Sequence, residues 1–158
     1  MTPAIALLKK MRTSHSVHSY AHDSRAASYG LEAAELLGLP AARVYKTLLV
    51  SSDEAELLVA LVPVNAQLNL KAVAASAKVK KVEMADPLRA QRSSGYLVGG
   101  ISPLAQKKAL RTFVDRTATE HATIYISAGR RGLEVELSAD DLLSLTQGQL
   151  ADIASFAR

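Results

Sequence analysis

The sequence contains no cysteine and no tryptophan. The absence of cysteine excludes a disulfide framework, a thiolate metal site and a cysteine nucleophile supplied by the protein. Any thiol that takes part in chemistry at this protein must therefore belong to a ligand. Aromatic residues are few, at 4%, but hydrophobic residues make up 49% of the chain, which is typical of a globular protein.

Several standard catalytic and nucleotide-binding motifs are also missing. The chain has no Walker A sequence, no Rossmann glycine fingerprint before a helix, no Gly-x-Ser-x-Gly elbow and no metalloprotease helix. The residues offer no standard pair of nucleophile and base. Hydrolysis that relies on such a pair is therefore not indicated.

Long apolar stretches are absent as well. The N-terminus lacks the apolar core of a signal peptide, and no apolar run approaches the length that spans a membrane. These observations predict a cytoplasmic protein without a membrane partner. A length of 158 residues predicts a single domain over 1–158, large enough to bury a core without disulfides or a metal.

Positive charge is concentrated in one part of the chain. Residues 71–116 contain ten basic and three acidic side chains, a net charge of +7, whereas the whole chain has a net charge of +4. Such a segment could be an electrostatic footprint for phosphate or nucleic acid. Solvated lysines on helix faces would give the same counts.

Residues 91–108 form the most unusual stretch of the sequence. Glycines at Gly95, Gly99 and Gly100 allow positive φ and a close backbone approach to a ligand, and basic residues flank them. The stretch is too rich in Gly, Ser and Pro for one regular element, yet its middle is apolar. It predicts a structured loop that binds an anionic ligand; a tight turn between two buried strands is the alternative.

Helix and strand signals alternate along the chain. Capping pairs predict helices that begin at Thr2 and Pro3, at Ser28 with Gly38 at the end, at Asp86 and Pro87, and at Ser138. An alanine-rich helix is predicted over 70–77. Strands are predicted at 44–50, 57–62, 81–84, 111–115, 123–127 and 134–137, with a further short strand within 14–22. Both faces of 57–62 are apolar, which favours an α/β or α+β arrangement with covered sheet faces.

Lys46 is unusual within its predicted strand. It shares a face with Leu48 and Val50, and a lysine rarely points into an apolar face unless it reaches a pocket or a partner. A lysine at a strand edge that extends to solvent is the alternative. Thr47 points to the other face.

The last two predicted strands allow a register to be assigned. Matching polar with polar faces across an antiparallel pair places Ser127 opposite Glu134 and Tyr125 opposite Glu136, with 128–133 as the connection. This polar face could line a site. A hairpin that faces solvent would show the same pattern.

Three of the four histidines lie within 14–22, which raises the question of a metal site. His15, His18 and His22 would share a face in a helix, but the segment has a poor helix composition. In a strand, His15 would lie on the opposite face from the other two. We therefore predict no metal site here.

The chain resembles the YbaK family of aminoacyl-tRNA deacylases, which is related to the editing (insertion) domain of prolyl-tRNA synthetase. The resemblance covers essentially the whole chain and is strongest for the Cys-tRNA(Pro) and Cys-tRNA(Cys) deacylase branch. It rests on Thr2-Pro3-Ala4, Val44-Tyr45-Lys46-Thr47-Leu48, Lys80-Lys81-Val82-Glu83-Met84-Ala85-Asp86-Pro87, Gln91-Arg92-Ser93-Ser94-Gly95-Tyr96-Leu97-Val98-Gly99-Gly100-Ile101-Ser102-Pro103 and Gln106-Lys107-Lys108.

The resemblance implies a compact α/β domain with a mixed, barrel-like sheet flanked by helices. It also implies removal of cysteine from mischarged Cys-tRNA(Pro) in trans, without a cofactor. In that branch the thiol of the cysteine substrate attacks its own carbonyl, so that the enzyme need only bind, orient and polarise the ester. The implied partners are the acceptor end of aminoacyl-tRNA and prolyl-tRNA synthetase.

The resemblance also assigns residues to the site. Lys46 corresponds to the functional lysine and Gly99 to the backbone contact of the glycine loop, and both are expected to be catalytic. The expected substrate-binding residues are Tyr20, Thr47, Gly100, Ser127 and Glu134. The family typically has Asp where this chain has Glu134, a change that keeps the charge and adds a methylene.

Two other activities remain open at the level of sequence. A sibling deacylase would act on Ala-tRNA or Ser-tRNA and use water in place of a substrate thiol. A non-catalytic module would bind tRNA or phosphate through the same basic surface without cleaving an ester.

Overall fold

The computed structural model describes residues 1–22 and 29–157. Within these residues five α-helices are present, and all of them were predicted from the sequence. They are α1 (Pro3–Lys10), α2 (Tyr29–Leu37), α3 (Leu70–Ala77), α4 (Pro87–Ser94) and α5 (Ala139–Thr146). The predicted N-cap of α2, Ser28, lies outside the described residues.

Side-chain caps explain where three of these helices begin. The hydroxyl of Thr2 accepts a hydrogen bond from the Ile5 N–H at 3.3 Å, and Ser138 accepts from the Asp141 N–H at 3.1 Å. The Asp86 carboxylate accepts from the Arg89 N–H at 3.0 Å. Each cap satisfies a backbone donor that the first turn of a helix leaves free.

The described strands form three sheets. A five-stranded sheet has the order β5-β2-β3-β6-β9, a three-stranded sheet has the order β1-β8-β7, and β10 pairs with β4. The strands are β1 (Ser16–Ser19), β2 (Tyr45–Ser52), β3 (Leu57–Pro63), β4 (Ala66–Leu68), β5 (Val82–Met84), β6 (Thr112–Asp115), β7 (Ile124–Arg130), β8 (Leu133–Leu137), β9 (Gln149–Ala151) and β10 (Ala154–Phe156). The large sheet is mixed, since β6 lies parallel to both β3 and β9.

The sheets do not close into a barrel within the described residues, which corrects the barrel-like arrangement expected from the sequence. The reason lies at β2. On the side away from β3, strand β2 pairs with β5 only over Val50–Ser52. On the same side the chain meets β7 through a single parallel bridge between Val44 and Tyr125. The hydrogen-bond ladder is therefore interrupted between the two larger sheets, and an edge of β2 stays open.

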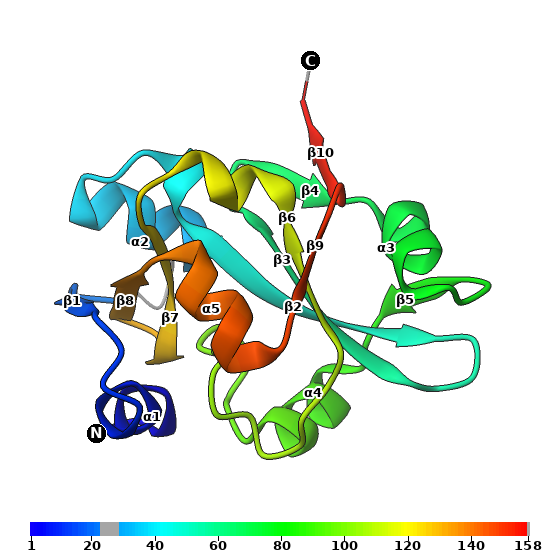
Figure 1. The fold of residues 1–158 in the computed structure, drawn as a ribbon, viewed down its shortest axis with the longest axis horizontal. Coiled ribbons are helices and arrows are strands. Elements are labelled where there is room, and N and C mark those ends of the chain that lie inside the picture. Colours follow the sequence, from blue (N-terminus) through cyan, green and yellow to red (C-terminus); the bar gives the residue numbers. More distant parts are fainter. Residues whose placement is uncertain (23–28, 158) are drawn as a thin grey trace.

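Both faces of the large sheet are covered, as the sequence predicted. Every residue of β3 is buried. Its Val59 and Leu61 pack in a core with α1 and α5, whereas Leu58, Ala60 and Val62 pack in a second core with α3. Figure 1 shows α5 and α3 on either side of the strands of this sheet, and the sheet of β1, β8 and β7 beside its end.

The hairpin of β7 and β8 has the predicted register. Ser127 lies opposite Glu134 and Tyr125 opposite Glu136. The predicted connection is too long, however, because β7 continues to Arg130 and β8 begins at Leu133. A register shift after Ser127 absorbs the extra residues, which the positive φ of 115° at Gly129 permits.

This hairpin does not present its polar face to solvent, so that alternative is wrong. Tyr125 is 5% exposed and Glu134 is 6% exposed. Tyr125 packs in a core with Ala33 and Ala34 of α2. Helix α2 covers Tyr125 on the polar face of the hairpin. The side chains of this face can therefore line an internal site.

The stretch at 91–108 is a structured loop, but it begins later than predicted because α4 continues through Ser94. The residue that ends the helix, Gly95, has a φ of 83°. The loop does not join two strands, so the tight-turn alternative is wrong. The Tyr96 hydroxyl donates to the Leu104 carbonyl at 2.7 Å, and the Lys107 N–H donates to the Ser94 carbonyl at 2.9 Å. The first bond spans the loop, and the second ties the end of the loop to α4.

Among the described residues, no helix combines the length and the apolar character that crossing a membrane requires.

Candidate functional site

A cavity of about 490 Å³ runs along the open edge of β2. The cavity gathers residues from β2, from the loop at 95–108 (the glycine loop), from the hairpin of β7 and β8 and from the chain after β1. Six of the seven residues predicted from the sequence line it: Tyr20, Lys46, Thr47, Gly99, Ser127 and Glu134. Residues separated by more than 100 positions therefore meet at one site.

The open edge of β2 supplies consecutive residues, Tyr45–Leu49, to the wall of this cavity. The Val44 carbonyl accepts from the Val64 N–H at 2.8 Å, so the main chain of Val44 faces β3. Main-chain groups alternate in an antiparallel ladder, and those of Thr47 therefore face away from β3, toward the open edge. The buried Thr47 hydroxyl also has no partner within the described ranges. The strand thus offers unpaired polar groups to a ligand.

Lys46 is a half-buried cation in the wall of the cavity. Burial lowers the pKa of its ammonium group, and no carboxylate in the described part of the chain offsets this effect. The partial burial of its side chain in the cavity wall favours a lysine that lines the pocket over one that extends freely to solvent. A partly desolvated ammonium is suited to bind a ligand oxygen.

Glu134 faces the same cavity from β8 and is almost fully buried. Burial raises the pKa of its carboxyl group to about 8. A carboxyl group with this pKa is mostly protonated at neutral pH. A cationic group that enters the cavity would favour its ionised form.

Ser127 joins the hairpin to the glycine loop. Its hydroxyl donates to the Gly100 carbonyl at 3.0 Å and accepts from the Gly129 N–H at 3.2 Å. The hydroxyl is therefore engaged with the backbone on both sides. This arrangement fits a residue that shapes the cavity better than a residue that attacks a substrate.

The two neighbouring glycines of the loop have different surroundings. Gly99 lines the cavity and has a φ of 95°, while Gly100 does not line it. The Gly100 N–H donates to the Leu97 carbonyl at 3.0 Å. The Gly99 N–H has no partner among residues 1–22 and 29–157. Gln91 supports this geometry, because its side-chain oxygen accepts from the Val98 N–H at 2.9 Å.

Tyr20 closes the site from the chain after β1. Its N–H donates to the Gly132 carbonyl at 3.0 Å, which extends the pairing of β1 with β8. Burial is the main cause that raises the pKa of its phenol, and the charge of Glu134 contributes to the rise. Tyr20 therefore stays protonated and can donate a hydrogen bond into the cavity.

The apolar part of the wall was not predicted. It consists of Gly30, Leu48, Leu49, Met84, Ala85, Pro87, Ala90, Val98 and Ile101. A Cβ atom at Gly30 would lie 2.4 Å from the Val64 side chain, so glycine lets α2 approach the sheet beside Lys46. A glycine within a helix is the one signal that could have indicated this contact.

The histidines near the site are paired with carboxylates. His18 lies 3.0 Å from Glu136, and His22 lies 2.9 Å from Glu32. Across the described residues no group of three His, Asp or Glu side chains could hold a metal ion.

Comparisons with known proteins identify the family of the chain. Residues 24–145 match the model of the aminoacyl-tRNA editing domain. EbsC of Enterococcus faecalis, described as a candidate Cys-tRNA(Pro)/Cys-tRNA(Cys) deacylase, is 38% identical over 122 residues, which is 77% of this chain and 74% of that protein. The sequence motifs had indicated the same family.

Solved structures share the fold. The hypothetical protein APE2540 superposes with a TM-score of 0.87 at 24% identity, over 98% of this chain and 100% of that chain. A candidate trans-editing enzyme for prolyl-tRNA synthetase superposes with a TM-score of 0.83 at 19% identity, over 98% of each chain. With the matched sequence, these likenesses identify the fold as that of the editing domain. The chain belongs to the aminoacyl-tRNA editing domain family.

Proposed function

We propose that this protein is a trans-editing deacylase that removes cysteine from mischarged Cys-tRNA(Pro), and from Cys-tRNA(Cys) to a lesser or similar extent. The single observation that carries the proposal is the cavity beside β2, which brings Lys46, Gly99 and Glu134 together. The name of the Enterococcus faecalis relative supports this choice of aminoacyl group.

The reaction uses the thiol of the substrate. The sulfur attacks the ester carbonyl carbon, the bond to the ribose oxygen breaks, and the thiol proton is transferred to that oxygen. The products are a cyclic thiolactone and tRNA with a free terminal hydroxyl. This route needs no nucleophile from the protein, which has no cysteine, and it leaves Ser127 in its structural contacts.

The protein contributes orientation and electrostatic stabilisation. Lys46 contacts the terminal ribose or phosphate region and positions the ester. The free Gly99 N–H faces the carbonyl oxygen, where negative charge develops. One such donor can lower the barrier by roughly 3 kcal/mol. Gly100 acts indirectly by holding the loop against the hairpin.

The aminoacyl group occupies the part of the cavity formed by Tyr20, Thr47, Ser127 and Glu134. The α-amino group of the substrate is cationic, and its approach lowers the raised pKa of Glu134 toward the ordinary value. The carboxylate so formed pairs with the ammonium. Glu134 thereby serves in place of the Asp that is typical of the family.

The partner of the reaction is proposed to be prolyl-tRNA synthetase, which would supply discrimination among tRNAs. A chain of 158 residues acting as one editing domain offers little surface for reading a whole tRNA. The protein is also proposed to act in the cytoplasm.

A panel of aminoacyl-tRNAs tests the proposal. Cys-tRNA(Pro) is expected to lose its amino acid fastest, and the same tRNA charged with serine should react at least about tenfold more slowly because a hydroxyl is the weaker nucleophile. Equal rates for cysteine and serine would point to an activated water. Preference for Ala-tRNA or Ser-tRNA would establish the sibling activity. Binding of tRNA without cleavage of any ester would establish a non-catalytic module.

A further inference from the structure

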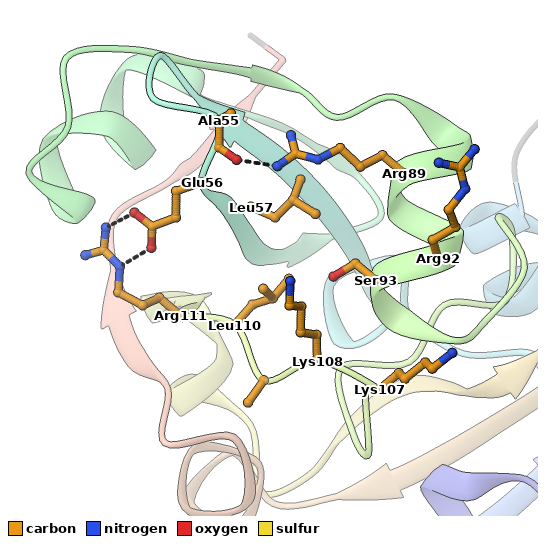
Figure 2. Close-up of a pocket in the computed structure, with 11 residues that line it drawn as sticks. Ala55, Glu56, Leu57, Arg89, Arg92, Ser93, Lys107, Lys108, Leu110 and Arg111 are labelled. Carbon is orange, nitrogen blue, oxygen red and sulfur yellow. Dashed lines mark hydrogen bonds and ion pairs between the residues drawn. The ribbon is translucent and has the colours of Figure 1, made fainter.

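A second hollow, a groove of about 810 Å³, lies beside helix α4 (Figure 2). Positive side chains dominate its rim. Its polar and charged lining residues are Arg89, Arg92, Ser93, Lys107, Lys108 and Arg111, together with the single carboxylate of Glu56. No step of the proposed deacylation uses any of these groups.

Helix α4 separates this groove from the candidate site. Pro87 and Ala90 line the candidate site, whereas Arg89, Arg92 and Ser93 line the groove. A spacing of three or four residues puts side chains on one face of a helix, so the two sets occupy different faces of the same two turns. The two hollows therefore lie on different sides of α4.

Two of the arginines are held by the protein itself. Arg111 makes two hydrogen bonds to the Glu56 carboxylate, at 2.9 and 3.0 Å, and this pair raises the pKa of Arg111 and lowers that of Glu56. Arg89 donates to the Ser51 hydroxyl at 3.0 Å and to the Ala55 carbonyl. These contacts build one wall of the groove and neutralise the carboxylate of Glu56.

Three cations at the opposite end have no such partner. Arg92, Lys107 and Lys108 make no side-chain ion pair within the part of the chain that the structure describes. Their backbone is nevertheless fixed, because the Lys108 N–H donates to the Ser93 carbonyl at 3.0 Å. Figure 2 shows the Lys108 side chain directed into the groove and those of Arg92 and Lys107 at its rim.

A buried hydroxyl marks the same end of the groove. Ser93 is 9% exposed, and its hydroxyl has no hydrogen-bond partner among the described residues. Figure 2 shows this oxygen turned toward the groove. A buried polar group without a partner is costly, so its presence indicates a ligand that accepts or donates a hydrogen bond there.

We propose that this groove binds phosphate groups of the tRNA backbone, while the aminoacylated end occupies the cavity on the other face of α4. The inference rests on the proposed function, because it requires a polynucleotide substrate that passes across α4. Arg92, Lys107 and Lys108 neutralise successive phosphates, and the Ser93 hydroxyl donates a hydrogen bond to one of them.

The shape of the groove favours a backbone over a free phosphate ion. A compact site for one phosphate brings several donors to one point, whereas here the free cations are spread along an open rim. Flexible lysines and an arginine on a rim suit the repeated charges of a strand. Five of the ten basic residues in 71–116 line this groove, whereas none of the ten lines the cavity beside β2.

Binding of uncharged tRNA tests the groove without any ester chemistry. The double variant Arg92→Gln/Lys108→Gln is compared with the control Lys9→Gln/Lys10→Gln, which removes the same charge from the exposed end of α1. We expect the groove variant to bind roughly 10- to 100-fold more weakly at low salt, with a salt slope reduced by about 2, one unit for each lost phosphate contact. The control should keep the slope of the wild type.

Ser93→Ala provides the second variant. It removes only the hydroxyl that lacks an internal partner, so the melting temperature should not fall, while tRNA affinity should decrease several-fold. If both variants bind tRNA with the affinity and salt slope of the control, the proposal is overturned. Displacement of tRNA by inorganic phosphate at micromolar concentration would also overturn it, since the site would then belong to a free ion.

Deacylation separates this inference from the proposed function. The groove variants should lose activity on Cys-tRNA(Pro) but retain it on the cysteinyl ester of adenosine, which has no backbone phosphate. Equal losses on both substrates would place the groove residues at the reacting centre and contradict the proposal. A wild-type protein that cleaves neither substrate would refute the proposed function, while the binding of uncharged tRNA would still test the groove.

Discussion

The hydroxyl of Ser127 lies 3.0 Å from the Gly100 carbonyl oxygen and donates a hydrogen bond to it. This bond connects the hairpin of β7 and β8 to the glycine loop, and the same hydroxyl accepts from the Gly129 N–H. The position of the Gly99 N–H in the cavity depends on this connection. Ser127 is therefore a residue that positions the loop.

Ser127→Ala should loosen the loop. The variant loses two hydrogen bonds, so we expect it to be destabilised by about 1 to 2 kcal/mol. Deacylation should fall mainly through kcat, since the Gly99 N–H is no longer held at the ester carbonyl. Denaturant unfolding and steady-state kinetics measure the two effects. Ser144→Ala, at an exposed serine of α5, is the matched control and should change neither quantity.

Gly100→Ala should be strongly destabilising for a different reason. A Cβ atom at this position would lie 2.6 and 2.8 Å from main-chain atoms of Arg130, which cannot move aside as a flexible side chain could. We expect a loss of about 2 to 4 kcal/mol in the free energy of unfolding. Gly38→Ala is the control, because Gly38 has open space around it and only its φ of 66° disfavours alanine, by roughly 1 to 2 kcal/mol. A smaller loss at Gly100 than at Gly38 would contradict the packing of the loop on the hairpin.

Much of the architecture could be predicted because local signals were strong. The caps at Thr2, Asp86 and Ser138 begin helices as expected, and alternating polar residues fixed the pairing of Ser127 with Glu134. These features depend on neighbours in sequence or on one strand partner. The expected site residues were named from motifs, and six of the seven line the cavity at the open edge of β2.

Other features depend on distant packing and left no local signal. The alternation of polar and apolar residues around Tyr125 and Glu134 is the same whether this face of the hairpin is buried or exposed. The packing of α2 over the hairpin is what buries it. The open barrel results from the short pairing of β2 with β5, which strand lengths alone do not determine. The orphan hydroxyl of Ser93 likewise follows from tertiary packing.

Glu134→Gln should change how stability depends on pH. The raised pKa, about 8, means that between about pH 4.5 and 8 the folded state keeps a proton that the unfolded state releases. Raising the pH through this window therefore destabilises the wild type, by up to about 1.4 kcal/mol per pH unit. The variant lacks this titration, so its stability relative to the wild type should increase from pH 5 to 8. Denaturant unfolding across this range measures it, and parallel pH profiles of the two proteins would show that Glu134 titrates normally.

Lys46→Met should separate activity from stability. Methionine keeps an apolar side chain of similar length and removes the partly desolvated ammonium, so we expect deacylation of Cys-tRNA(Pro) to fall at least about tenfold while the melting temperature at pH 7 stays equal or rises. Because the pKa of Lys46 is lowered in the folded state, the burial penalty of the wild type is present at neutral pH and declines as the pH rises toward the ordinary lysine pKa. The melting temperature of the wild type should therefore approach or exceed that of the variant at high pH. Activity that survives in a folded Lys46→Met protein would show that the site lies elsewhere.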